Sequence, residues 1–408
     1  MENLKTKEKT TVKIILGLQH LIAMFGSTIL VPALTGLDPS VALFSAGVGT
    51  LIFHLCTKGK VPVFLGSSFA FISVICIVAE QYGDLRYAQG GLFVAGLIYV
   101  IISFIVKKIG VSKIRAILPA HVVGPMIIVI GLNLIPTAFN MIKENYLLAA
   151  ITLGVTLIIH IFGKGFFKQI AILIGVIVGY TISLFMGMVD TSSISEAAFV
   201  SIPNFTLPKF ELGAIVIIAP VVLAVFMEHI GDITSNGRVV GKNFIEDPGL
   251  NRTLLGDGLA TMVASLIGGP ANTTYGENTG VLAITKNYNP EILRITAIFA
   301  IILSFVGKFG SVIRGIPQPV MGGISLMLFS MIALVGVRTI VDEKVKFNIS
   351  NIIVMITILF VGLGNNFGLS IKIDITSSVA LNGLSLAAII GVLLNLILTF
   401  LIKQFKNR

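Results

Sequence analysis

The amino-acid sequence predicts an all-α polytopic membrane protein with about 14 transmembrane segments. The first reason is composition, because 55% of the residues are hydrophobic and only 12% are charged, against roughly 25% charged residues in a soluble domain. The second reason is that apolar runs of about 17–25 residues recur along the whole chain. The third is that two glutamates lie deep inside such runs, which is typical of a polar site built within a membrane protein.

The apolar runs are long enough to cross a hydrocarbon core of about 30 Å. The first run begins near Val12 and has no small-residue cleavage site, so we expect a membrane helix there and not a removable signal peptide. In chain order the expected spans cover residues 12–34, 41–57, 63–80, 90–107, 116–137, 146–163, 168–188, 212–233, 252–268, 273–285, 292–313, 318–337, 348–365 and 380–402.

The basic residues are distributed unevenly between the two sides of the membrane that these spans define. With the N-terminus inside, all but six of the 29 Lys and Arg residues fall in inner segments. The six on the outer side are Arg86, Lys143, Lys209, Lys308, Arg314 and Lys372. This positive-inside pattern predicts a plasma or inner membrane protein with cytoplasmic N- and C-termini. Orientation in the lipid bilayer thus accounts for the net charge of +10, and we expect no nucleic-acid partner.

Glu228 and Glu277 are the two glutamates at membrane depth. Glu228 lies in the apolar stretch 212–233, and Glu277 lies in GGPANTTYGENTGVLAITK. A charged side chain there costs roughly 2.5–3.5 kcal/mol on insertion scales, so it persists where a polar cavity or a partner compensates it. The competing structural explanations are a cation beside Glu228 and a favourable helix dipole at Glu277. Two such acids in separate segments favour transport or conduction.

The third and tenth spans differ from the others because their first halves are polar and rich in small residues. The third begins VPVFLGSSFAF from Val61, and the tenth begins with Pro270 and continues through NTTYGEN. Non-helical backbone is tolerated at membrane depth only where protein buries it or water lines it. Interrupted segments at corresponding positions of two halves are the best sequence indication of a transporter's binding site.

Short matches between the two halves indicate an internal duplication of about 207 residues. Gln19-His20 resembles Glu228-His229 at an offset of 209, and Pro62 and Pro270 differ by 208. Phe69 and Tyr275, each after two small hydroxyl residues, differ by 206. Chance similarity in a biased composition is the alternative. Each half would carry seven spans, and an odd number forces the second copy to be inverted, which gives a 7+7 inverted repeat.

The stretch from Asn272 to Lys286 resembles the signature of the nucleobase–ascorbate transporters, also called the nucleobase:cation symporter-2 family. That signature is an acid or Gln, then Asn-x-Gly, four residues, Thr and a basic residue. Here these places are filled by Glu277, Asn278, Gly280, Thr285 and Lys286. Glu at the first place is the form of bacterial uracil permeases. The resemblance extends over nearly the whole chain, through residues 19–26, 65–73, 228–231 and 317–323.

The resemblance implies a core, substrate-binding domain formed by residues 12–107 and 212–313, and a gate domain formed by 116–188 and 318–402. It implies short strands in segments 3 and 10, each followed by a shortened helix, that meet near the midplane of the membrane. Family members are typically proton symporters and often form homodimers through the gate domain. The implied function is therefore secondary active import of uracil by proton symport.

The resemblance also implies which residues bind the base. Glu228 and Glu277 would bind its ring N–H groups, the main chain of Phe69 and Gly276 would hydrogen-bond it, and Tyr275 would lie beside it. Elementary chemistry agrees, because uracil offers two N–H donors, two carbonyl acceptors and a flat π face. A charge-assisted hydrogen bond to a carboxylate is roughly twice as strong as a neutral one.

One position departs from the uracil permease pattern. Those permeases carry Glu-His-x-Gly-His on span 8, whereas this chain has Glu228-His229-Ile-Gly-Asp232. The i, i+4 spacing places Asp232 on the same helix face as Glu228. The family's histidine is thought to link proton movement to substrate binding, and an aspartate can also hold a proton. We therefore assign proton coupling to Asp232 and Glu228, and to His229 a packing or hydrogen-bonding role.

Other function classes lack sequence support. No Walker motif or Gly-x-Ser-x-Gly elbow occurs, and His54, His121 and His160 have no metal-ligand spacing. Cys56 and Cys76 lie in or beside apolar segments, so no disulfide framework is expected. We thus expect neither an enzyme nor a bound cofactor or metal. Asp257 is expected to pair with a nearby cation.

Two alternative functions stay open. The first is a purine permease of the same family for xanthine, hypoxanthine or urate, against which Glu at position 277 argues. The second is an anion channel or exchanger that shares the 7+7 fold. Its site is expected to be cationic, and two central carboxylates would repel its substrate.

Overall fold

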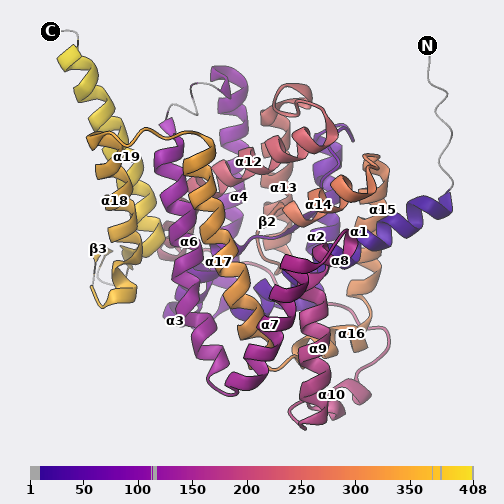
Figure 1. Cartoon of the computed structure of the whole chain (residues 1–408). Coiled ribbons are helices and arrows are strands. Elements are labelled where there is room, and N and C mark those ends of the chain that lie inside the picture. Colours follow the sequence, from indigo (N-terminus) through magenta and orange to yellow (C-terminus); the bar gives the residue numbers. More distant parts are fainter. Residues whose placement is uncertain (1–9, 112, 114–116, 370, 377–378, 407–408) are drawn as a thin grey trace, which may run out of the picture.

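The computed structural model describes residues 10–111, 113, 117–369, 371–376 and 379–406, which are mostly helical (Figure 1). Of the basic residues assigned above to the inner side, Lys5, Lys7, Lys9, Arg115 and Arg408 lie outside the described residues.

Eight helices within the described residues are long and apolar enough to cross a membrane. They are α1 (Thr10–Thr35), α2 (Pro39–Cys56), α4 (Leu85–Ile109), α6 (Ala120–Ile142), α11 (Leu212–Ile218) continued by α12 (Val222–Val240), α17 (Gln318–Asp342), α18 (Ile349–Leu363, extended by a 3-10 turn to Phe367) and α19 (Gly383–Lys406). The prediction of a polytopic helical membrane protein is therefore confirmed.

The other helices are shorter. They are α3 (Ile72–Tyr82), α7 (Tyr146–Phe162), α8 (Phe166–Gln169), α9 (Ala171–Phe185), α10 (Thr191–Glu196), α13 (Leu250–Leu266), α14 (Gly276–Thr285), α15 (Pro290–Ser304) and α16 (Gly307–Arg314). Each of the predicted spans contains a helix, but several of these helices are too short to cross a membrane alone. The count of fourteen spans stays a prediction.

Several predicted spans have different boundaries in the structure, and the fifth, eighth and eleventh differ for reasons that the structure shows. The fifth was placed at 116–137, but α6 starts after Pro119 and continues to Ile142. The eighth was ended at residue 233, but its helix continues to Val240 and stops at Gly241, whose φ of 75° favours glycine.

The eleventh span was predicted as one segment, 292–313, and it is broken into α15 and α16. The break has a backbone cause. The amide of Ser201 donates to the carbonyl of Phe305 at 2.9 Å, and the amide of Gly307 donates to the carbonyl of Phe199 at 3.0 Å. The loop between the two halves thus takes hydrogen-bonding groups that a continuous helix would need.

Small residues let the long helices approach closely. A Cβ atom on Gly96 of α4 would stand 2.8 Å from the carbonyl oxygen of Gly258 in α13, and one on Gly258 would stand 2.9 Å from that of Gly96. Gly124 of α6 and Gly336 of α17 face each other in the same way. Glycine pairs of this kind are typical of helix packing in membranes.

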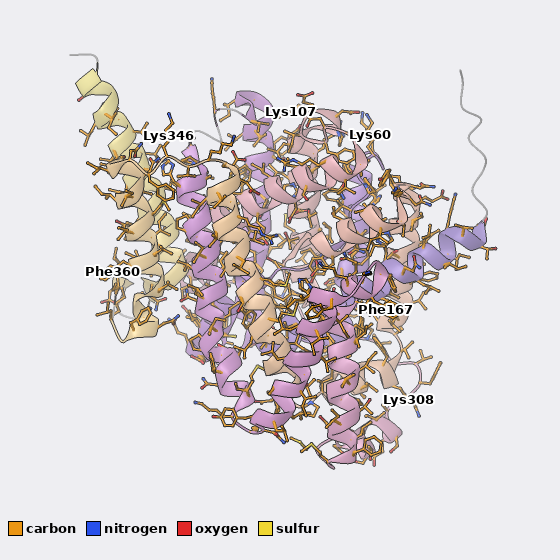
Figure 2. All side chains as sticks on the ribbon, in the orientation of Figure 1. Lys60, Lys107, Phe167, Lys308, Lys346 and Phe360 are labelled. Carbon is orange, nitrogen blue, oxygen red and sulfur yellow. The ribbon has the colours of Figure 1, made fainter. Side chains whose placement is uncertain are left out.

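The packing partners fall into two sets. Helix α13 packs on α2 and α4, and α15 packs on α1 and α2, whereas α17 packs on α6 and α7, and α18 packs on α6 and α19. Lys60, Lys107 and Lys346 gather at one end of the molecule and Lys308 lies at the other, while Phe360 projects from the side (Figure 2). Three lysines assigned to the inner side thus lie at one end and Lys308, assigned to the outer side, lies at the other, while the orientation in the membrane stays a prediction.

Candidate functional site

Two three-residue strands pair inside the helical bundle, β1 (Leu65–Ser67) and β2 (Asn272–Thr274). They run antiparallel, with Leu65 opposite Thr274, Gly66 opposite Thr273 and Ser67 opposite Asn272. The short strands predicted in segments 3 and 10 are therefore present.

Each residue of β2 follows its counterpart in β1 by 207 residues, so the Gly66–Thr273 pair lies on a local two-fold axis. This offset is the one that the sequence duplication indicated. By the same offset Phe69 corresponds to Gly276, which shifts the predicted Phe69–Tyr275 equivalence by one residue. The two residues expected to offer main-chain N–H groups are thus equivalent positions of the two halves.

Buried side chains form hydrogen bonds with those backbone groups of the two strands that no neighbouring strand reaches. The hydroxyl of Thr50 accepts the amide of Leu65 at 2.9 Å. The hydroxyl of Thr261 accepts the amide of Asn272 at 3.2 Å and donates to its carbonyl at 3.1 Å. Polar side chains therefore make the non-helical backbone stable at membrane depth.

Tyr275 stabilises the place where β1 and β2 pair, which we call the strand crossing. Its hydroxyl donates to the carbonyl of Ser67 at 3.0 Å, its amide donates to the carbonyl of Phe64 at 3.0 Å, and only 3% of the residue is exposed. A Cβ atom on Gly66 would stand 2.3 Å from the Tyr275 ring. Its hydroxyl is thus committed to β1, and contact between Tyr275 and a base stays a prediction.

We expect Gly66→Ala to destabilise the protein, because the Tyr275 ring fills the space that the new methyl group needs. Overpacking of this kind costs about 1–3 kcal/mol. Thermal unfolding in detergent measures the effect. Gly154→Ala in α7 is the matched control, since a Cβ atom there meets nothing within 4 Å. Equal melting temperatures for the two variants would contradict the role given to the ring.

A helix begins directly after each strand, and neither beginning has a side-chain cap. The 3-10 turn Phe69–Phe71 leads into α3, and α14 begins at Gly276. Gly276 is accessible to solvent, and a Cβ atom there would meet nothing within 4 Å. Uncapped N-terminal amides can donate hydrogen bonds to a ligand, for example to its carbonyl oxygens.

Buried polar atoms without a partner flank both helix starts. Ser68 Oγ precedes Phe69, and Asn278 Oδ1 follows Glu277; neither atom has a hydrogen-bond partner among the described residues. Because nearly all buried polar atoms in proteins are hydrogen-bonded, such atoms indicate room for a polar ligand or water.

Three predicted carboxylates come together beside these helix starts. Glu228 and Asp232 lie one turn apart on α12, Glu277 lies in the first turn of α14, and these two helices pack on each other. Neither Glu228 nor Asp232 forms an ion pair or a hydrogen bond with a described residue. The explanation of Glu228 as an ion-paired packing residue therefore has no support in this structure.

One face of α12 is accessible from Glu228 to the end of the helix. Gly231 and Ser235 are exposed, Asp232 is half-buried, and Arg238 at the end of this face is exposed. These residues follow Glu228 at helical spacing. The accessible face connects the carboxylates with the end of the molecule that carries Lys60 and Lys107.

Ser27 is a contact of the site that the sequence did not reveal. Its hydroxyl donates to Glu277 Oε1, although the two residues are 250 positions apart. Ser27 lies on α1 and is fully buried. Its helix resembles an ordinary apolar span, so only its position in the fold identifies the residue.

Asp257 pairs with His229, which corrects the expectation of a cationic partner such as Arg252. Asp257 Oδ2 lies 2.7 Å from His229 Nδ1, and Arg252 instead donates to the carbonyl of Cys56. His229 Nε2 lies 2.9 Å from the Thr253 hydroxyl. His229 is fully buried on the face of α12 away from Glu228. It ties α12 to α13, in agreement with its predicted hydrogen-bonding role.

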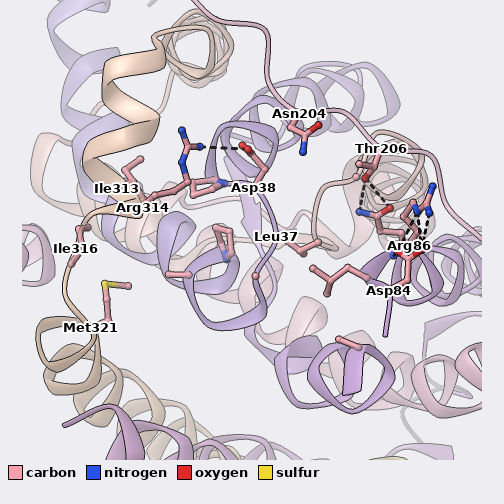
Figure 3. Close-up of a pocket in the computed structure, with 18 of the residues that line it drawn as sticks. Leu37, Asp38, Asp84, Arg86, Asn204, Thr206, Ile313, Arg314, Ile316 and Met321 are labelled. Atoms are coloured by element: carbon pink, nitrogen blue, oxygen red, sulfur yellow. Dashed lines mark hydrogen bonds and ion pairs between the residues drawn. The ribbon is translucent and has the colours of Figure 1, made fainter. Parts of the chain in front are cut away.

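A separate cavity of about 750 Å³ opens at the other end of the molecule and is lined by none of the predicted site residues (Figure 3). Asp38 and Arg314 form an ion pair of 3.5 Å at its rim. Hydrogen bonds from Arg86 and Lys209 hold the pKa of Asp84 well below its usual range. Gln89 and Thr206 are hydrogen-bonded at 3.1 Å. Residues of both sets of helices line this cavity.

Among the described residues, no three His, Cys, Asp or Glu side chains form a group that could hold a metal ion. The strand crossing offers hydrogen-bonding groups of two kinds, carboxylates and main-chain amides. Carboxylates can accept its N–H groups, and main-chain amides can donate to its carbonyls.

Comparisons with known proteins agree with this arrangement. The model of a family described as "Permease family" matches residues 12–371. The uracil permease of Bacillus caldolyticus is 44% identical over 401 residues, which cover 94% of this chain and 91% of the relative. The uracil permease of Bacillus subtilis (strain 168) is 43% identical over 402 residues, which cover 94% of this chain and 91% of the relative.

Among solved structures, the murine Solute Carrier 26 family member A9 anion transporter in the inward-facing state superposes with a TM-score of 0.72. It is 11% identical, and the match covers 98% of this chain and 69% of that one. At this identity the likeness concerns the fold alone. The fold is that of the 7+7 inverted-repeat transporters, as the sequence predicted.

Proposed function

The chain belongs to the permease family whose model matches residues 12–371, and on that basis we propose that it imports uracil by proton symport. It is a multi-pass membrane transport protein, and the relatives above are named permeases and not enzymes. Uracil is the substrate named for those relatives.

The observation that carries the proposal is the meeting of two carboxylates with two uncapped helix starts at the strand crossing. Glu228 and Glu277 suit the two ring N–H groups of uracil, and a charge-assisted bond to each is roughly twice as strong as a neutral one. The main-chain amides of Phe69 and Gly276 suit the two carbonyl oxygens. The Phe69 ring, or that of Tyr275, can pack against the flat face.

We assign the coupled proton to the pair formed by Glu228 and Asp232. They lie one turn apart on α12, and two carboxylates at this spacing do not both ionise easily, so they share a proton. Uracil is neutral at pH 7, and its accumulation requires a coupled ion. The accessible face of α12 through Gly231 and Ser235 supplies a route for the proton to one side of the membrane.

The two sets of packed helices support a division into two domains. Residues 12–107 and 212–313 form a core domain that carries the substrate, and residues 116–188 and 318–402 form a gate domain. The basic end of the molecule faces the cytoplasm with both termini, in the plasma or inner membrane. Exposed apolar residues such as Phe360 on the gate domain fit the lipid bilayer or a second copy of the chain.

The two alternatives have less support. A purine permease of the same family is expected to carry Gln at the first signature position, whereas this chain carries Glu277 there. An anion exchanger shares the fold, but the carboxylates at the strand crossing would repel an anion. Uptake of radiolabelled uracil into proteoliposomes, competed by uracil, xanthine and sulfate, separates the three. We expect unlabelled uracil alone to compete; competition by xanthine or sulfate at equal concentration would contradict the proposal.

A further inference from the structure

We propose that Ser27 determines which hydrogen-bonding pattern the site accepts, because its hydroxyl occupies one of the two oxygens of Glu277. This inference rests on the proposed function, in which Glu277 receives an N–H group of the base. In the structure the Ser27 hydroxyl donates to Glu277 Oε1, the one hydrogen bond that this side chain forms with a described residue.

The place of Ser27 is fixed from several sides. The carbonyl of the next residue, Thr28, accepts the Ser67 hydroxyl of β1 at 3.3 Å. On the preceding side, a Cβ atom on Gly26 would stand 2.6 Å from the side chain of Ile172 in α9. This turn of α1 therefore packs against β1, α9 and α14. A serine with 0% exposure at such a place cannot easily turn its hydroxyl to another partner.

The arrangement leaves Glu277 with one oxygen, Oε2, that accepts no hydrogen bond from a described residue. A carboxylate with both oxygens free accepts two adjacent N–H donors side by side, as it does with a guanidinium. The Ser27 hydroxyl takes one acceptor site of Oε1 and so disfavours this two-point contact, which leaves Oε2 as the better acceptor for a single N–H group. The site is thus suited to a base whose ring N–H stands alone between groups that are not donors.

Uracil has this pattern, because a carbonyl group flanks each of its ring N–H groups. Without Ser27, the second oxygen of Glu277 would face a carbonyl oxygen of uracil and repel it. The hydrogen bond from the Ser27 hydroxyl weakens that repulsion. Isocytosine carries an amino group in place of the 2-carbonyl oxygen of uracil and has one ring N–H group fewer. Its ring N–H and amino group are adjacent donors that match a carboxylate with two free oxygens.

Ser27→Ala should therefore change selectivity and not only affinity. We expect the ratio of the isocytosine Kd to the uracil Kd to fall by about tenfold or more, since isocytosine gains a charge-assisted bond and uracil gains a repulsion. Binding of both bases to the purified full-length protein by isothermal titration gives the ratio. Thr35→Val is the matched control, because Thr35 is a buried hydroxyl on the same helix that bonds only to the carbonyl of Val31. Its ratio should equal that of the wild type.

Each outcome decides between the claims. If the wild type binds no uracil, the proposed function fails, and the role of Ser27 fails with it. If the wild type binds uracil and Ser27→Ala keeps the wild-type ratio, or weakens both bases equally, the proposed function stands and the role of Ser27 is refuted. If Ser27→Ala does not fold, Ser27→Cys replaces it, since a thiol is a weaker donor of similar size. An unchanged ratio in Ser27→Cys then refutes the proposal, and an intermediate fall supports it.

Discussion

Glu277→Gln is expected to weaken uracil binding by about ten- to a hundredfold while the protein stays folded. The reason is the loss of a charge-assisted hydrogen bond, which contributes about 1.5–3 kcal/mol. The glutamine carbonyl can still accept the Ser27 hydroxyl, which turns the amide NH2 toward the ring N–H of the base and sets donor against donor. Equilibrium binding of radiolabelled uracil to the purified protein measures the change.

The matched control is Glu291→Gln, which removes a glutamate charge outside the site. Glu291 lies at the start of α15 and pairs with Lys13 at 2.5 Å. We expect its uracil affinity to equal that of the wild type. A Glu277→Gln variant with undiminished uracil affinity would remove Glu277 from the site.

Asp232→Asn is expected to uncouple transport. The variant binds uracil and equilibrates it across the membrane, but it no longer concentrates uracil against a gradient, because the shared proton has lost one of its two carboxylates. A membrane potential of about 100 mV supplies roughly 2.3 kcal/mol per charge, and that driving force is lost. Proteoliposomes with an imposed pH gradient measure the effect through counterflow and net uptake.

Asp342→Asn at the end of α17 is the control for this experiment, since Asp342 lies at a helix end away from the strand crossing. We expect it to concentrate uracil as the wild type does. If Asp232→Asn also concentrates uracil to the wild-type level, Asp232 is not the coupling group, and Glu228 alone becomes the candidate.

The sequence predicts those features of the site that depend on local pattern. Glu228 and Glu277 stand out because a charge is costly in an apolar run. The polar segments that contain Gly66 and Thr273 predict interrupted, non-helical backbone, and the resemblance to the family implies that it forms short strands. The 207-residue offset agrees with the pairing register. Such signals are readable because the membrane tolerates few exceptions to the apolar helix.

Contacts between distant segments are not predictable in this way. Ser27 lies in an apolar helix with no local sign of its bond to Glu277. Asp257 follows Arg252 closely in sequence, yet its partner is His229, because the packing of α12 on α13 and not sequence spacing decides the contact. The break after Ser304 similarly depends on a loop about a hundred residues earlier that takes up backbone hydrogen bonds.

The location of the substrate is the most direct test of this account. A structure determined with uracil bound should place the base at the strand crossing between segments 3, 8 and 10, in contact with Phe69, Glu228 and Glu277. A structure in which uracil is bound mainly by side chains of residues 116–188 or 318–402 would contradict it.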